Sequence, residues 1–170
     1  MTAEQLVRGR APSRRRSRGI RAGRRLLLCG ALLVSACADD DGGERRRALG
    51  DRPTLEAAMR VADSRRGGRL FGRCAACHTI GPGAGDRNGP NLFAVMNKPV
   101  ASNSPRYGYT AALRALGGTW TPEAMDRWLA DPMTVAPGTR MRFEGLADPL
   151  DRADVIAYLH SHSAGTASTR

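Results

Sequence analysis

The sequence has no apolar run long enough to cross a lipid bilayer. The longest one covers residues 26–36, eleven residues, and as a helix it would span only half of a hydrocarbon core of about 30 Å. The segment before it has almost no acidic charge: residues 1–36 hold nine arginines and a single acid, Glu4. An arginine-rich start followed by a short apolar run is typical of a signal peptide. We therefore predict that residues 1–36 are a signal peptide and that the protein is exported.

Once this segment is set aside, the chain has little excess charge. The net charge is +11 for all 170 residues, but residues 1–36 carry +8 and the remainder only +3. A strongly basic folded domain would suggest a nucleic-acid partner. Because most of the positive charge lies in the removable segment, we expect no nucleic-acid binding.

Cysteines are scarce, which limits the use of disulfides. The chain has four: Cys29 inside the apolar run, Cys37 directly after it, and Cys74 and Cys77 further on. Val34-Ser35-Ala36-Cys37 resembles the bacterial lipobox, whose cysteine receives a diacylglycerol. We therefore predict that Cys37 is lipidated and anchors the protein on the periplasmic side of a membrane. The alternative is cleavage after Ala38, which would give a soluble periplasmic protein.

The chain also lacks alternating strand patterns and internal repeats, and residues 37–60 hold few large apolar side chains. We interpret residues 37–60 as a flexible tether, because such a composition buries too little area to offset its ordering entropy. Residues 61–165 form the predicted folded domain, followed by a tail over 166–170. The domain is predicted to be all-α, with four to five helices joined by long loops. The main helices are expected over 62–74, 109–116, 121–131 and 148–161, with Thr121 as N-cap and Pro122 in the first turn.

The stretch Cys74-Ala75-Ala76-Cys77-His78 carries the clearest chemistry. Two thiols three apart on a helical turn can add to the two vinyl groups of haem, and the following histidine then faces the iron. A structural zinc site needs four ligands, and only His160 and His162 remain besides this motif. A thioredoxin-like dithiol would need a βαβ context, whereas the surroundings are helix and loop. The motif therefore predicts one covalently attached haem c.

A haem-bound histidine leaves a sixth coordination position on the iron. A methionine sulfur is the usual partner of histidine in electron-carrying haem proteins. Four methionines follow the motif, namely Met96, Met125, Met133 and Met141. Met125 lies within a predicted helix, where a core role is expected. Met141 lies in the irregular loop Pro137-Gly138-Thr139-Arg140-Met141 and is the favoured candidate.

An ordered series of motifs over residues 65–162 resembles the class I cytochrome c family of the mitochondrial and small bacterial type. The motifs are Gly67-x-x-x-Phe71, CAACH-Thr79, Gly89-Pro90-Asn91-Leu92, Tyr107-x-Tyr109-Thr110, Trp120-Thr121, Trp128-Leu129-x-x-Pro132, Pro137-Gly138-Thr139-x-Met141-x-Phe143-x-Gly145 and Arg152-x-Asp154-Val155-Ile156-Ala157-Tyr158-Leu159. The resemblance implies thioether links at Cys74 and Cys77, with His78 and Met141 as the two axial iron ligands.

The same resemblance implies roles for residues around the haem. The Pro90 carbonyl would accept the second N–H of His78, and Tyr109 and Trp120 would donate to a buried propionate. Thr139 would hold the distal loop near that propionate, and Phe143 would close the crevice. Gly67, Phe71 and Tyr158 would pack between the crossing terminal helices.

Three residues depart from the mitochondrial pattern. Trp128 replaces a tyrosine that bonds the distal sulfur, Leu113 replaces an asparagine, and Lys98 replaces an arginine near the propionate. An indole can only donate a hydrogen bond and an ammonium is a point charge, so these changes bear on the reduction potential.

The resemblance implies a one-electron carrier, and not an enzyme, because both axial positions are filled. Its expected partners are membrane respiratory complexes and a terminal oxidase or periplasmic reductase, met by a monomer through transient electrostatic docking. Basic residues expected at the docking surface are Arg73, Arg87, Arg140 and Arg142. Two alternatives are a haem subunit of a periplasmic dehydrogenase complex and an enzyme or gas sensor with an open haem.

Overall fold

A computed structural model describes residues 41–163 of the chain. Residue contacts divide the chain into two units, Met1–Cys37 and Ala38–Arg170, and the described residues all belong to the second. The predicted signal peptide, Cys37 and the tail over 166–170 lie outside the described residues and stay predictions. The described part is helical, with one isolated bridge between Pro99 and Thr119 and no named strand, which confirms the all-α class.

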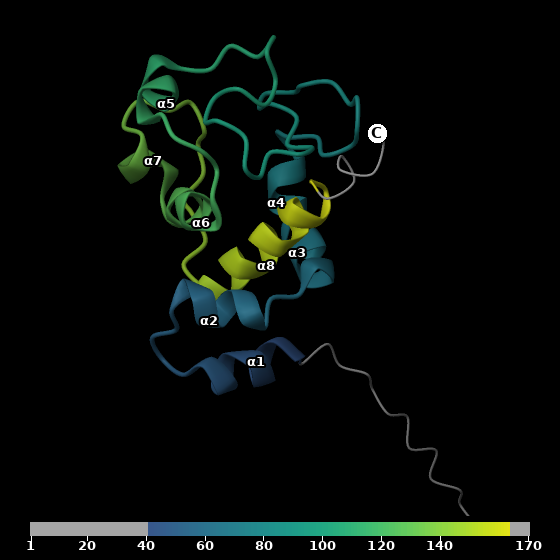
Figure 1. The fold of residues 1–170 in the computed structure, drawn as a ribbon, viewed down its shortest axis with the longest axis vertical. Coiled ribbons are helices and arrows are strands. Elements are labelled where there is room, and N and C mark those ends of the chain that lie inside the picture. The colour runs from purple at the N-terminus through teal and green to yellow at the C-terminus, as the bar shows by residue number, and fades with distance from the viewer. Residues whose placement is uncertain (1–40, 164–170) are drawn as a thin grey trace, which may run out of the picture. The chain divides into compact units, whose positions relative to one another are not determined.

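Eight short helices follow one another along residues 41–163. They are α1 (Asp41–Leu49), α2 (Leu55–Arg60), α3 (Ser64–Leu70), α4 (Gly72–Ala75), α5 (Ala111–Leu116), α6 (Pro122–Ala130), α7 (Pro132–Val135) and α8 (Pro149–Ser161) (Figure 1). None of these helices has the length and apolar character needed to cross a membrane.

The helix starts follow the capping chemistry of the sequence. Thr121 accepts from the backbone N–H of Ala124 at 3.2 Å, and Pro122 occupies the first turn of α6. Asp148 likewise accepts from the N–H of Leu150 at 2.8 Å at the start of α8. Both starts agree with the predicted ones, because a polar side chain before a proline satisfies an N–H that the helix itself cannot pair. Between α6 and α8 the structure has a further short helix that was not predicted, α7, which begins behind the cap Asp131.

The crossing of α3 and α8 is the main contact between helices in the domain. A Cβ added to Gly67 would lie 2.0 Å from the carbonyl oxygen of Asp154, so the two backbones meet at a point where no side chain fits. Beside this point the rings of Phe71 and Tyr158 lie 5.2 Å apart. The close approach explains why glycine is required at position 67.

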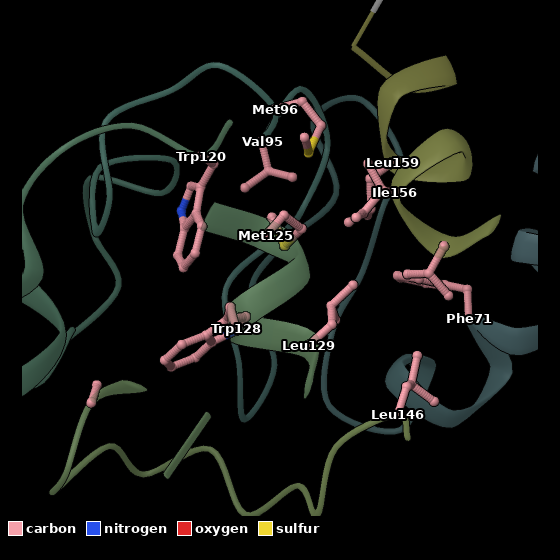
Figure 2. Close-up of a cluster of buried hydrophobic side chains, with 12 residues drawn as sticks. Phe71, Val95, Met96, Trp120, Met125, Trp128, Leu129, Leu146, Ile156 and Leu159 are labelled. Carbon is pink, nitrogen blue, oxygen red and sulfur yellow. The ribbon is translucent and has the colours of Figure 1, made fainter. Parts of the chain in front are cut away.

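The hydrophobic core lies between α6, α8 and the loops around them. Figure 2 shows Met125, Trp128 and Leu129 projecting from α6, with Ile156 and Leu159 facing them from α8. Trp120 lies next to Trp128, their ring centroids being 5.6 Å apart. Buried aromatic and aliphatic groups of this size provide most of the stabilising apolar area in a domain of about 100 residues.

The tether interpretation is wrong for residues 41–60, because the structure folds them into α1 and α2. The arginines of α1 pair with acids of α8: Arg45 contacts the buried carboxylate of Asp154 at 2.8 Å. In α2, Ala58 is completely buried, and Leu55 and Met59 pack against the core. Ion pairs with a distant helix thus stabilise a segment whose own composition is too polar to fold alone.

Candidate functional site

A cavity of about 390 Å³ opens between the helices and loops of the domain. Its walls come from α4, α5, α6, α8 and the loops over 77–110 and 139–143. All nine of the site residues predicted from the sequence line it: Cys74, Cys77, His78, Pro90, Tyr109, Trp120, Thr139, Met141 and Phe143. Segments far apart in the chain therefore converge on one mostly apolar space.

The two thiols are positioned by a helical turn. The N–H groups of Cys77 and His78 both donate to the carbonyl of Cys74, at 3.0 and 2.9 Å. Cys74, Cys77 and His78, which this turn holds close together, all line the cavity. Burial raises the pKa of the Cys74 thiol, whereas Cys77 is exposed. The thiols are therefore one turn apart, the arrangement expected for attachment to a flat group beside them.

The imidazole of His78 has a defined orientation. Its Nδ1 lies 2.8 Å from the carbonyl oxygen of Pro90, which can only accept, so Nδ1 carries the proton and Nε2 keeps its lone pair. Burial lowers the pKa of His78, and the bond to Pro90 opposes this only in part, so the ring favours the neutral form. A Cβ on Gly89 would lie 2.3 Å from Cε1 of the ring. The ring therefore rests against a backbone that has room for it only because residue 89 is glycine.

Met141 reaches the cavity from a separate loop. The turn before it passes through Gly138, whose φ of 94° favours glycine, and Thr139 accepts from the N–H of Met141 at 3.3 Å. The guanidinium of Arg140 donates to the carbonyl of Gly108, which ties this loop to the segment carrying Tyr109. The sequence therefore uses a threonine and an arginine to hold a short irregular loop in place.

Polar groups that the sequence assigned to a propionate lie along the same cavity. The hydroxyl of Tyr109 accepts from the N–H of Ser104 at 3.0 Å, which leaves its own proton for donation, and burial raises its pKa. The side chain of Thr139 is 6% exposed and that of Trp120 is 7% exposed. Donors in so dry a place need an acceptor, which is the environment that an anionic group of a buried ligand would match.

Two further features were not predicted. Arg140 lines the cavity, whereas Lys98, which the resemblance put in place of an arginine near the propionate, is exposed and does not line it. Asn103 also lines the cavity and donates to the carbonyls of Asn91 and Phe93, at 2.7 and 3.1 Å. Nothing in the local sequence marks Asn103, because its partners are ten to twelve residues away across a turn.

Of the three other methionines considered, Met125 is buried and lines the cavity, Met96 is buried outside it, and Met133 is exposed. Trp128 and Leu113, the other two departures from the mitochondrial pattern, both line the cavity. Among residues 41–163, no cluster of three or more histidine, cysteine or carboxylate side chains is close enough to hold a metal ion.

The residues present fit a covalently attached haem. The cavity is mostly apolar, two thiols and an imidazole with an available Nε2 line it from one turn of the chain, and a glycine leaves space for the imidazole. The fold and the site together define the class: an all-α domain built around one covalently attached haem.

Comparison with known proteins then identifies the family. The Cytochrome c family profile matches residues 64–163. The cytochrome c homolog of Bradyrhizobium diazoefficiens is 37% identical over 109 residues, which cover 64% of this chain and 59% of the relative. The cytochrome c2 of Rhodomicrobium vannielii is 40% identical over 103 residues, covering 61% of this chain and 82% of the relative. The match thus spans about three fifths of the Bradyrhizobium protein.

A solved structure agrees with these relatives. Cytochrome cH from Methylobacterium extorquens superposes with a TM-score of 0.56 at 35% identity, over 59% of this chain and 99% of that one. The chain belongs to the class I cytochrome c family. It is therefore a monohaem c-type electron carrier, not an enzyme, with its haem attached through the CxxCH motif at Cys74 and Cys77.

Proposed function

We propose that this cytochrome holds its haem iron between His78 and Met141 and carries single electrons between membrane respiratory complexes and a terminal oxidase or periplasmic reductase. The observation that carries the proposal is that both side chains line one cavity from separate segments of the chain. A haem bound with histidine and methionine supplies a one-electron couple of relatively high potential. With two protein ligands, no position at the iron would remain for a substrate.

In this proposal each wall of the cavity has a separate task. On the proximal wall, Pro90 would keep the imidazole of His78 in one tautomer and one orientation, so that Nε2 donates to the metal. Cys74 and Cys77 would hold the porphyrin covalently beside this imidazole.

The distal wall would present the sulfur of Met141. Thr139 bonds the backbone at Met141, and Arg140 ties the loop to Gly108, so the sulfur would be held without movement during a redox change. Tyr109 and Trp120 would satisfy a propionate, and Phe143 would exclude water from the crevice. Small reorganisation on electron transfer follows from such a fixed and dry site.

The cavity rim supports docking of acidic partners. Arg73, Arg140 and Arg142 line the cavity and are exposed, and Arg73 lies 5.4 Å above the ring of Phe143. Arg87 is exposed but does not line the cavity, since it donates to the carbonyl of Ala75 at 2.6 Å. Positive charges at the rim would steer a negatively charged partner towards the site.

We further propose that the protein acts outside the cytoplasm and is anchored through a lipid on Cys37. The basis is the signal-peptide pattern of residues 1–36 and the lipobox-like end of that pattern. A lipoprotein cysteine carries two or three acyl chains, which bind a bilayer stably, and confinement near the membrane raises the effective concentration of its partners. Mass spectrometry of the protein extracted from membranes tests this directly, because it would detect lipid and haem on one chain.

The ligand proposal is tested by Met141→Ala. The substitution should abolish the weak sulfur-to-iron charge-transfer band of the oxidised protein and lower its reduction potential. Met133→Ala is the matched control, because Met133 is 39% exposed and outside the cavity, and it should change neither property. A band and a potential that survive Met141→Ala would exclude Met141 as the ligand. Absence of the band in the unaltered protein would favour an open haem instead.

A further inference from the structure

Residues 41–60 precede the 64–163 segment shared with the family, and yet they are folded and attached to it. We call residues 41–60 the N-terminal arm. Its first helix, α1, has the sequence DGGERRRAL, in which only Ala48 and Leu49 are apolar. A helix with so little apolar surface cannot attach by hydrophobic burial, so other contacts must hold it.

Those contacts are made with the carboxylate of Asp154, which is completely buried on α8. Arg45 donates to both of its oxygens, at 2.8 and 3.1 Å, and the backbone N–H of Asp63 donates to Oδ1 at 2.7 Å. The Nε of Arg66 lies 3.1 Å from Oδ2 as an ion-pair contact. A buried carboxylate paired with a two-pronged guanidinium is among the strongest polar contacts in proteins, provided both partners stay in place.

Two more acids complete the attachment, the N-cap residue Asp148 and Asp151 within α8. Arg46 of α1 pairs with Asp148 and Asp151, and Arg66 of α3 also donates to Asp151, at 2.9 Å. Acids spaced three apart lie on one face of a helix, so they form a continuous row towards α1. We call these side chains the Arg–Asp cluster: Arg45, Arg46, Arg66, Asp148, Asp151 and Asp154.

The second helix of the arm is attached differently. In α2 the side chain of Ala58 is fully buried, and Leu55 and Met59 pack against the hydrophobic core. The arm therefore consists of one helix held by charge and one held by apolar contacts. Salt weakens the partly exposed pairs of Arg46 with Asp148 and Asp151, screens the buried Arg45–Asp154 pair much less, and leaves the apolar contacts of α2 largely intact.

We propose that α1 is a releasable latch that sets how far the haem domain can move from its anchor. While the Arg–Asp cluster is formed, only four peptide steps separate Cys37 from α1, a reach of about 14 Å. When α1 is released and α2 stays docked, eighteen steps separate Cys37 from Leu55, a reach of about 60 Å. The consequence for reach depends on the proposed lipidation of Cys37, whereas the latch itself does not.

The position of α1 in the fold bears on what release of the latch would change. Figure 1 shows α1 beneath α2, at the far side of the domain from α5. Thr110 and Leu113 at the start of α5 line the haem cavity. With the latch closed the domain would stay within the short reach of its anchor, and opening would let the cavity approach partners further from the membrane.

Hydrogen exchange of the haem-loaded protein tests the latch. In low salt the amides of α1 should exchange slowly, and Arg45→Gln should speed their exchange at least tenfold while the amides of α8 beyond Asp154 keep their rates. Arg47→Gln is the matched control on the same helix, because Arg47 is exposed and outside the Arg–Asp cluster. Raising the ionic strength from about 0.05 M to about 1 M should speed the exchange of the α1 amides by less than Arg45→Gln does, because the Arg45–Asp154 pair is buried, and it should spare α2.

Three outcomes would contradict the proposal that α1 is a releasable latch. These are unprotected α1 amides in the unaltered protein at low salt, equal effects of Arg45→Gln and Arg47→Gln, or exchange that rises in α1 and α2 together with salt. Should Arg45→Gln not fold, Arg46→Gln replaces it, because its partners Asp148 and Asp151 are partly exposed. A failed lipid assignment would appear in the mass of the membrane form and would leave the exchange result unchanged, so the two failures are distinguishable.

Discussion

Gly89 shows how one missing side chain can determine the position of a ligand. A Cβ at this residue would lie 2.3 to 2.8 Å from three atoms of the His78 ring. We predict that Gly89→Ala displaces the imidazole and destabilises the holoprotein by about 1–3 kcal/mol, the usual cost of overpacking. The thermal midpoint and the yield of haem-loaded protein measure the effect.

Gly85→Ala serves as the control for this experiment, because a Cβ there meets nothing within 4 Å. Its midpoint should stay close to that of the unaltered protein. If both substitutions behave alike, the imidazole does not depend on the space at residue 89.

For single residues, the sequence predicted the motif residues of the haem site better than it predicted which loop side chains would lie beside them. Cys74, Cys77 and His78 follow from a motif whose spacing has a chemical reason, and all three line the cavity. Lys98 was assigned by its alignment with an arginine, yet it is exposed, and Arg140 lies on the cavity wall instead. Side-chain direction in a loop depends on tertiary contacts, which a motif does not record.

At the scale of elements, the crossing of α3 and α8 depends on backbone contact. Gly67→Ala would bring a Cβ to 2.0 Å from a carbonyl oxygen of α8, and backbone cannot move aside as a flexible side chain can. We predict a loss of about 3 kcal/mol in the free energy of unfolding. Gly72→Ala is the matched control in α4, where a Cβ meets nothing, and it should be neutral or stabilise by about 0.5–1 kcal/mol. Chemical denaturation of both variants measures these changes in the free energy of unfolding.

Asp148, the N-cap of α8, makes the stability of the fold depend on pH. Burial raises the pKa of Asp148, but hydrogen bonds from Arg46 and from the N–H of Leu150 outweigh it, so the pKa is lowered overall. A lowered pKa means that this stabilisation is present above the ordinary aspartate value of about 3.9 and is lost as the pH falls through the folded-state value. Arg46→Gln should therefore lower stability by no more than about 1 kcal/mol near neutral pH.

The same variant should differ less from the unaltered protein as the pH falls below about 4, because protonated Asp148 no longer gains from the arginine. Thermal midpoints measured for both proteins across this range test the prediction. A difference that stays constant into acid would mean that Arg46 acts by packing and not by charge.

Helix starts and the tether illustrate what the sequence can and cannot predict about elements. The starts of α6 and α8 follow from Thr121-Pro122 and Asp148-Pro149, since capping is a local interaction. The folding of α1 could not be predicted locally, because Arg45 and its partner Asp154 are 109 residues apart. Polar composition alone indicates a tether, and only the acids on a distant helix change that outcome.

At the scale of the whole molecule, the cationic rim predicts a salt-dependent reaction. Arg142 lines the cavity and is exposed, so Arg142→Gln should slow electron transfer with an acidic redox protein by about two- to fivefold at low ionic strength. Arg69→Gln, on the exposed side of α3 and away from the cavity, should have little effect. Stopped-flow rates over a series of salt concentrations measure both.

The two rates should converge at high salt, where exposed charges are screened. A difference that persists there would indicate that Arg142 contributes through contact instead of long-range attraction. The chain has a single lysine, Lys98, and its other basic side chains outside the histidines are arginines, which stay charged at all accessible pH values. The docking rate should therefore change little between about pH 7 and pH 10.

The chain has two tryptophans, and both of them, Trp120 and Trp128, line the cavity, with ring centroids 5.6 Å apart. Their emission is therefore an internal optical signal of whether the whole domain is assembled. A haem held in the cavity absorbs where indoles emit, so the tryptophan fluorescence of the native protein should be almost fully quenched. Unfolding that separates α6 from the CAACH turn should restore the tryptophan emission. The emission intensity at one wavelength would then report the folded fraction without any added label.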